Sequence, residues 1–161
     1  MASLKEFLES EAEKLRSEQA AALTERQEWI AAVERLFAQI KEWLAQADTK
    51  RILMIDESPI RIAERGLGTY EIPALTIGLG TREACIKPVA RHVAAPLRST
   101  GSIQVPRAYG RVDMTNGLDR YMIFRTELEP DDRWIIIEQN EPLMEWFDRN
   151  SFEIALKSLL E

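Results

Sequence analysis

The fold is set by residues 3–47, which read SLKEFLESEAEKLRSEQAAALTERQEWIAAVERLFAQIKEWLAQA. This stretch contains no Gly and no Pro, and its apolar side chains recur every three or four residues, which predicts one amphipathic helix. Ser3 followed by Glu6 forms a capping-box start, while a second, weaker capping pattern leaves a break near Leu23 open. An unbroken helix of this length is about 65 Å long, at ~1.5 Å per residue.

The apolar face of this helix differs between its halves, although both halves point it in nearly the same direction. The later half is dense in large apolar side chains, and the earlier half is thinner and interrupted by Glu11 and Glu18. The helix is longer than a compact domain of the remaining residues, so part of it should project. The candidate interface residues on this face are Leu4, Leu8, Leu15, Ile30, Val33, Phe37, Ile40 and Leu44.

Three outcomes are open for this apolar face. It can pack wholly on its own chain, it can contact a helix of a second copy or of another protein, or its first half can be disordered. A helix–helix contact is the preferred hypothesis, because the sheet domain is too small to cover the whole apolar face and the thin first half fits a partner-facing helix. Its simplest form is a homodimer joined by a coiled coil.

Composition indicates one soluble domain with an arm. The chain has 161 residues, 45% of them hydrophobic, and a formal net charge of −6. No run approaches the ~18 apolar residues of a membrane span, and the charged N-terminus does not resemble a signal peptide. The single Cys85 excludes an intrachain disulfide. We therefore expect a cytoplasmic protein without membrane partners.

Past a polar break at residues 48–51, the apolar pattern changes to strand-like alternation, which predicts an antiparallel sheet. Glu57-Ser58-Pro59 reads as a turn between two short strands, and Pro73 places its strand at an edge or a bulge. Residues 94–102 read as an irregular surface loop. The strand candidates in this part are residues 52–55, 60–63, 70–79 and 84–93.

The clearest local signal is Asn116-Gly117 between two alternating segments, which predicts a tight hairpin. With residues 134–138 as the last strand, residues 109–138 read as a three-stranded antiparallel meander. Pro142 suits a first helical turn, and Asn150 suits the cap of a second helix.

The predicted fold class is therefore α+β, with an antiparallel sheet rather than alternating βαβ units. The expected organisation is a long helical arm over residues 1–47 and an antiparallel β domain with two short C-terminal helices over residues 51–161.

Basic residues gather in one segment of this acidic chain, because residues 81–125 carry eight basic and three acidic side chains. Arginine forks suit phosphate or carboxylate recognition, so one alternative is a regulatory domain that binds an anionic ligand or a nucleic-acid backbone through residues 82–111. An acidic protein is a poor nonspecific nucleic-acid binder. In the competing interpretation these arginines pair internally with acidic side chains. The candidate anion contacts are Arg91, His92, Arg98, Arg107 and Arg111.

Catalytic motifs are weak in this sequence. Cys85 and His92 would lie over ~20 Å apart on one strand and on opposite faces, which disfavours a thiol–imidazole pair. Nothing in the spacing of Asp56, Glu57 or Asp113 selects them from the other acids, so a hydrolase or transferase is a third alternative without a defined site. No cofactor or metal is predicted. The preferred function is a non-enzymatic assembly or adaptor protein that self-associates or binds a protein partner through its N-terminal helix.

Overall fold

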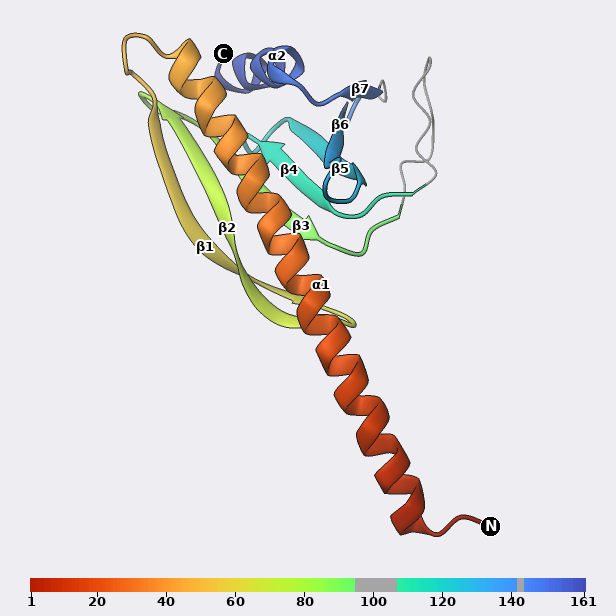
Figure 1. The fold of residues 1–161 in the computed structure, drawn as a ribbon. Helices are drawn as coiled ribbons and strands as arrows, with labels where there is room; N and C mark the ends of the chain where they lie inside the picture. The colour runs from red at the N-terminus through yellow and green to blue at the C-terminus, as the bar shows by residue number, and fades with distance from the viewer. Residues whose placement is uncertain (95–106, 142–143) are drawn as a thin grey trace.

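The computed structural model describes residues 1–94, 107–141 and 144–161. This described part is mixed α+β, with a 44-residue helix α1 (Leu4–Ala47), a C-terminal helix α2 (Arg149–Leu160) and seven strands (Figure 1). All seven strands join one antiparallel sheet in chain order, so each strand pairs with its neighbours in sequence. They are β1 (Met54–Glu64), β2 (Gly68–Leu79), β3 (Arg82–Ala90), β4 (Arg111–Thr115), β5 (Arg120–Glu127), β6 (Arg133–Glu138) and β7 (Met144–Trp146).

Helix α1 runs through Leu23 without a break, because no Gly or Pro interrupts its backbone hydrogen bonds. The predicted capping box is present: Ser3 Oγ accepts the Glu6 N–H at 3.2 Å, and the Glu6 carboxylate accepts the Ser3 N–H at 3.1 Å. Beyond the other end, the Asp48 carboxylate accepts the N–H groups of residues 52–53, both at 2.9 Å. These backbone hydrogen bonds lower the pKa of the Asp48 carboxyl.

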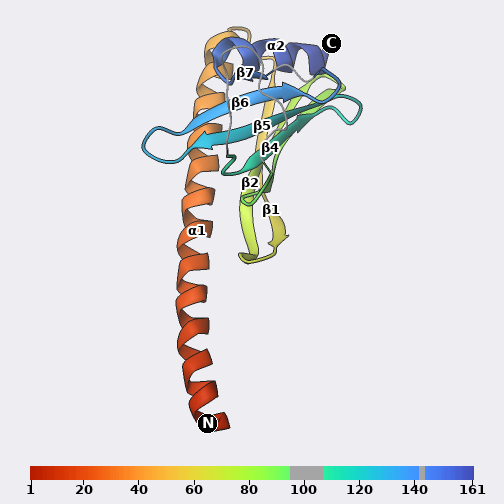
Figure 2. The same cartoon turned by 90° about the vertical axis from the view of Figure 1, so that its right-hand side faces the viewer.

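The two halves of α1 lie in different environments. The first half runs clear of the sheet in both Figure 1 and Figure 2, and the second half crosses one sheet face. The buried side chains of α1 all belong to the second half. They are Trp29, Ala32, Val33, Leu36, Phe37, Ile40 and Leu44.

The main core lies between one face of the sheet and the two helices. Trp43 of α1 joins the helices, because its ring centroid lies 5.6 Å from both Phe147 and Phe152. Arg149 at the start of α2 donates to Gln46 of α1 at 2.8 Å. Along β6, alternate side chains face away from the helices and form a second, smaller cluster with neighbouring strands. The buried members of that cluster are Ala108, Phe124, Ile135, Ile137 and Met144.

Strand β1 is continuous over 11 residues, so the predicted turn at Glu57-Ser58-Pro59 is wrong. Pro59 lies directly opposite Pro73 of β2. Two prolines can face each other only at a non-hydrogen-bonded pair, because neither has an N–H to exchange. The Pro59 nitrogen therefore points to the open edge of the sheet, where no partner strand needs a donor.

Pro73 marks the place where β2 separates from β3. The β2–β3 pairing ends at Leu75 opposite Ile86, and two residues further in the same register Pro73 would lie against Pro88. Neither proline can donate at that step, so the pairing stops. The β1–β2 hairpin continues alone and extends away from the other strands (Figure 2). Pro73 thus lies where β2 pairs only with β1, although β2 itself is an interior strand and not the edge strand that was predicted.

The predicted meander is present as β4, β5 and β6. Its first turn contains Asn116-Gly117, where the Asn116 side chain accepts the N–H groups of Leu118 and Asp119 at 2.9 and 2.8 Å. Gly117 has a φ of 95°, a region that glycine adopts without steric cost. The predicted surface loop 94–102 lies, apart from Ala94, outside the described residues.

The prediction of two C-terminal helices is wrong. Pro142 lies outside the described residues, and Met144–Trp146 form the short strand β7 on the free edge of β6. Its alternation of buried Met144 and exposed Glu145 is strand-like, but three residues are too few to reveal a period. The described C-terminal part contains one helix, α2. It is capped by Asp148, whose carboxylate accepts the Ser151 N–H at 2.9 Å, two residues before the predicted cap.

Candidate functional site

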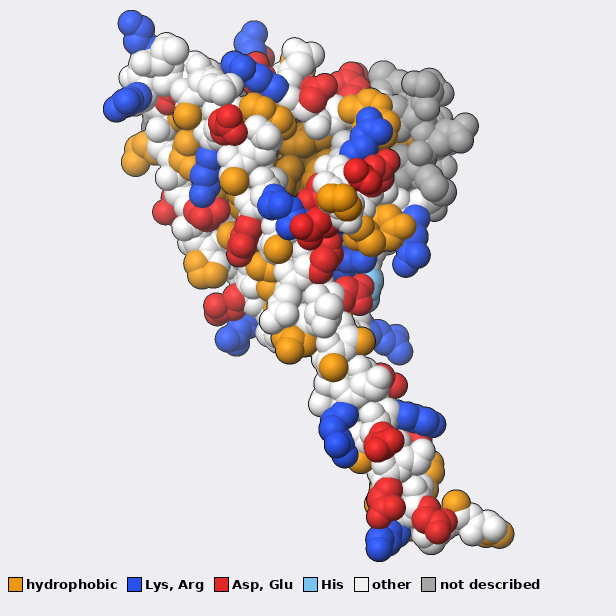
Figure 3. Space-filling view, in the orientation of Figure 1, with side chains coloured by type: hydrophobic (Ala, Val, Ile, Leu, Met, Phe, Trp, Pro, Cys, Tyr) orange, Lys and Arg blue, Asp and Glu red, His pale blue; other side chains and the backbone are white. Residues whose placement is uncertain are grey.

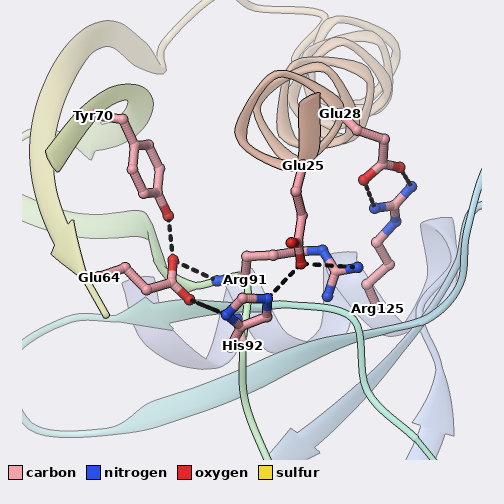
Figure 4. Close-up of polar contacts among 7 residues, drawn as sticks. All are labelled: Glu25, Glu28, Glu64, Tyr70, Arg91, His92 and Arg125. Atoms are coloured by element: carbon pink, nitrogen blue, oxygen red, sulfur yellow. Dashed lines mark hydrogen bonds and ion pairs between the residues drawn. The ribbon is translucent and has the colours of Figure 1, made fainter. Parts of the chain in front are cut away.

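Charged side chains converge where the middle of α1 crosses the ends of β1, β3 and β5. Glu25 and Glu28 of α1 face this point, and Figure 4 shows them beside Arg91, His92 and Arg125. Buried or half-buried charges are costly unless they are paired, so this cluster is the part of the described structure where a binding or catalytic role is best sought.

Arg125 is the most buried charge, with a side chain 0% exposed. Its Nη1 donates to Glu28 at 2.9 Å, and its Nε and Nη2 donate to Asp132 at 3.0 and 2.6 Å. Arg35 donates to the second Asp132 oxygen at 2.6 Å. Burial alone would lower the pKa of Arg125, but Glu28 and Asp132 raise it above its ordinary value. This guanidinium is fully engaged and joins α1 to β5 and to the turn before β6.

The pKa of Asp132 also reflects opposing effects of burial and of hydrogen bonding to charged partners. Burial acts to raise the pKa of the Asp132 carboxyl, but hydrogen bonds from Arg35 and Arg125 outweigh burial and lower it. The four side chains Glu28, Arg35, Arg125 and Asp132 form a neutral set of two acids and two bases. Such a set stabilises packing between elements and leaves no unpaired group for chemistry.

Glu64 at the end of β1 anchors the chain that follows β3. Its carboxylate accepts the backbone N–H of Arg91 at 3.1 Å and of His92 at 2.6 Å, and it also accepts the Tyr70 hydroxyl at 2.7 Å. Burial, reinforced by the Glu64 charge, raises the pKa of Tyr70, so the phenol stays protonated as the donor. These bonds fix the backbone that carries the Arg91 and His92 side chains.

Arg91 and His92 both turn toward Glu25. His92 Nε2 contacts the Glu25 carboxylate closely, and the nearest Arg91 nitrogen, Nη2, lies 3.7 Å from it. The Arg91 guanidinium carbon also lies 5.4 Å from the centre of the Tyr109 ring. Burial lowers the pKa of Arg91, and Glu25 and Glu28 offset only part of this effect.

Of the other candidate anion contacts, Arg107 lies near Arg91 at the Tyr109 ring, whereas Arg111 pairs with another acid. Arg107 is exposed and stacks on Tyr109, with its guanidinium carbon 5.0 Å from the ring centre. Arg111 donates to Asp113 at 2.7 and 2.9 Å, and Arg120 donates to the same carboxylate at 2.6 Å. Arg98 lies outside the described residues. Anion binding by this set stays a prediction.

A groove of about 880 Å³ lies beside the cluster, between α1 and the turn that joins β5 to β6. Its walls combine small apolar side chains with acids, and Arg91 is the one basic side chain that lines it within the described residues. The lining residues are Ala20, Ala21, Thr24, Glu25, Glu28, Arg91, Leu128, Glu129 and Pro130.

The predicted helix-interface residues divide between the two halves of α1. Val33, Phe37, Ile40 and Leu44 are buried on the chain's own sheet, and Ile30 is half-buried. The three early residues are all exposed, namely Leu4, Leu8 and Leu15.

Residues suspected of catalysis stay apart in the described structure. The Cys85 sulfur lies 3.9 Å from Thr76 Oγ1 and 3.6 Å from Glu83 Oε1, and His92 contacts Glu25 and Glu64 instead. Across residues 1–94, 107–141 and 144–161, no group of three or more His, Cys, Asp or Glu side chains could hold a metal ion. No helix in these ranges is long and apolar enough to cross a membrane.

The carboxylates of the enzyme alternative have other surroundings. Asp56 is exposed on β1, Glu57 pairs with Lys41 at 3.0 Å, and Asp113 is held by two arginines. The three do not converge on one cleft.

Sequence reasoning missed the members of the charged cluster other than Arg91 and His92. Two signals were present. Glu25 falls on the same helix face as Trp29 and Val33, and Arg125 falls two residues after Ile123, on the core-facing side of a strand. A charge on an apolar face calls for a buried partner. The partners of Arg125 could not be read, because Glu28 is 97 residues away.

Comparison with known proteins gives no relative for this chain: no protein-family description, curated protein or solved structure matches it.

Proposed function

We propose that this protein is a non-enzymatic assembly module that pairs with a second copy through the projecting half of α1. The observation that carries the proposal is the exposure of Leu4, Leu8 and Leu15, at 72%, 53% and 54%, on a capped helix that leaves the body of the molecule. Figure 3 shows this arm extending past the body, with acidic and basic side chains on the face in view.

Beyond its capping box, the arm has few stabilising contacts of its own. Its Lys14–Glu11 ion pair, at 3.4 Å, is exposed, and exposed pairs contribute ~0–1 kcal/mol. Most helical stability in proteins comes from packing of an apolar face, and the apolar face of the arm is not covered by its own chain. Covering one leucine stabilises by ~1.5–3 kcal/mol, so a partner helix that covers three of them on each copy supplies a useful association energy.

The spacing in the arm suits a coiled-coil seam. Leu8, Leu15 and Ala22 recur every seven residues, and Leu4 precedes Leu8 by four, which matches the apolar positions of a heptad. Glu11 occupies the seam between two leucines. A parallel pair would set the two Glu11 carboxylates directly against each other. An antiparallel pair with Leu4 beside Leu15 of the second copy offsets them by ~4.5 Å along the axis and sets each Glu11 beside Leu8. We therefore favour the antiparallel arrangement.

Light scattering after size exclusion tests the pairing. The full chain should elute as a dimer, and Leu8→Lys with Leu15→Lys should elute as a folded monomer, because two charges then occupy the seam. The matched control is Ser10→Lys with Ser17→Lys, which adds the same charge on the opposite side of the helix and should remain dimeric. A monomeric full chain over a wide concentration range would contradict self-pairing and leave a different protein as the occupant of the arm.

Cytoplasmic location belongs to the same proposal. Cys85 is free, and a single unpaired thiol fits a reducing compartment better than an oxidising one. Reaction of Cys85 with a thiol reagent in the purified native dimer, without loss of the dimer, is the expected result.

A further inference from the structure

Arg91 differs from the other buried arginine in what its guanidinium binds. An arginine has five N–H donors, and those of Arg125 are spread over Glu28 and Asp132. The Arg91 side chain is 9% exposed, yet its guanidinium makes no hydrogen bond within the described residues. Among the described residues its Nε is buried without a partner, and Glu25, at 3.7 Å, is its one acidic neighbour in ion-pair range. A buried donor without an acceptor is unfavourable, because it has given up its hydrogen bonds to water.

The Arg91 side chain is held in place without being neutralised. Its backbone N–H is fixed by Glu64 and its guanidinium lies over the Tyr109 ring. Glu25, the nearest acid, is shared with His92, as the dashed lines of Figure 4 show. A pre-positioned guanidinium with free donors is suited to an oxygen ligand, because little side-chain entropy remains to be lost on binding.

We propose that the groove beside α1 binds a small monocarboxylate, whose two oxygens accept hydrogen bonds from the Arg91 guanidinium and whose apolar substituent lies against Ala20, Leu128 and Pro130. The planar guanidinium fork matches the two oxygens of a carboxylate. The apolar side chains of the groove wall supply the surface that a hydrocarbon substituent would cover.

The acids around the groove select a carboxylate over phosphate. Glu25, Glu28 and Glu129 line the same groove, and each repels an incoming anion. A singly charged ligand meets about half the repulsion of a doubly charged phosphate. Glu28 is already committed to Arg125, and Arg125 and Arg107 are the nearby positive charges that add to the pull of Arg91.

Burial of the Arg91 charge supports this assignment. The pKa of Arg91 is lowered by burial, and Glu25 and Glu28 restore only part of the loss. A bound carboxylate would compensate the charge further and supply acceptors for the N–H groups that lack them.

Titration of the full chain by NMR tests the site, with acetate, hexanoate and inorganic phosphate as probes and sodium chloride at matched ionic strength. Binding is followed at the Arg91 Nε–Hε signal and at the backbone amides of residues 20–25. We expect hexanoate to bind with a Kd on the order of 1 mM and more tightly than acetate, since it covers more of the apolar wall. Phosphate should bind more weakly than either carboxylate.

Two variants should move the hexanoate affinity in opposite directions. Arg91→Lys removes the fork and should weaken binding about tenfold, because a lysine ammonium cannot donate two parallel hydrogen bonds to one carboxylate. Glu25→Gln removes a competing and repelling carboxylate and should strengthen binding about threefold. Arg133→Lys, at an arginine that stacks on Trp146 and does not line the groove, should leave binding unchanged.

Hexanoate that fails to bind, phosphate that binds as tightly as hexanoate, or Arg91→Lys with unchanged affinity would each overturn the proposal. A loss of affinity in Glu25→Gln would do the same, because it would make Glu25 part of the site and not a competitor. All these readouts are independent of whether the arm forms a dimer, since Leu4, Leu8 and Leu15 do not line the groove.

Discussion

The two halves of α1 carry the same helical period in the same phase, and yet one half is buried and the other is bare. Phe37 and Ile40 are 0% exposed, whereas Leu4 and Leu8 are 72% and 53% exposed. The period of an apolar pattern predicts which side of a helix is apolar. What covers that side depends on how far the sheet reaches, and the sheet fully buries side chains of α1 only from Trp29 onward. The two halves therefore differ in whether their own chain provides a surface that covers the apolar face.

Phe37→Ala should give the largest effect on this comparison. Its ring is fully buried between α1 and the sheet, so truncation removes apolar contacts and leaves a cavity. We expect a loss of about 4 kcal/mol in the free energy of unfolding, measured by urea denaturation. Phe7→Ala, in the arm, is the matched control and should cost less than about 0.5 kcal/mol in the monomer. Equal losses of unfolding free energy at Phe37 and Phe7 would contradict the proposed difference between the two halves of α1.

Gly110→Ala should give the next largest effect, because it acts on Trp29, the first buried residue of α1. A Cβ at position 110 would lie 2.2 Å from the Trp29 ring, and the backbone there has a φ of 143°. The ring is fully buried and cannot yield, so we expect a loss of about 3 kcal/mol in the free energy of unfolding. Gly117→Ala, also at positive φ but with open space around it, controls for backbone strain and should cost about 1 kcal/mol.

Asp132→Asn should give a smaller, pH-dependent effect. The folded pKa of this carboxyl lies below its ordinary value of 3.8, so its contribution is present above that pH and is lost as the pH falls through the folded pKa. At neutral pH the variant should lose about 2 kcal/mol, since Arg125 then lacks one charged partner. Once the pH falls below the folded pKa of Asp132, the two proteins should approach equal stability, which thermal unfolding across the pH range measures.

Glu6→Gln is the control for the pH experiment, because Glu6 belongs to the arm and its pairing is confined to the local cap with Ser3. Its cost should stay within about 0.5 kcal/mol at every pH. A pH profile of Asp132→Asn that parallels the parent protein would remove Asp132 from the acid response of the fold.

Local sequence signals carried much of the fold. Residues 4–47 contain no Gly or Pro, and Asn116-Gly117 favours a turn. Both signals act on the backbone of neighbouring residues, so the long helix and the β4–β5 hairpin could be predicted. Pro59 led to the wrong prediction of a turn. A proline is tolerated in an edge strand when its nitrogen faces the open edge, and the sequence does not reveal which strand lies at the edge.

The site was harder to predict than the fold. Arg91 and His92 were found because basic residues cluster along the chain, but what each of them contacts depends on Glu25 and Glu64, which lie 67 and 28 residues away from His92. The network around Arg125 is invisible to any local pattern for the same reason. Long-range pairing places charges together, and only the folded sheet brings the end of β3 against the middle of α1.

Leu15→Ala should give the smallest effect on stability and the most informative one about the arm. At high dilution the free energy of unfolding should change by less than about 0.5 kcal/mol, because Leu15 contacts little in the single chain. If the arm pairs with a second copy, the melting temperature of the parent protein rises with protein concentration by mass action. That rise should shrink in Leu15→Ala and persist in Ser17→Ala, on the opposite side of the helix. If the melting temperature of the parent protein does not depend on concentration, the first half of α1 remains solvent-exposed in solution. The difference between the two halves would then have no role in self-association.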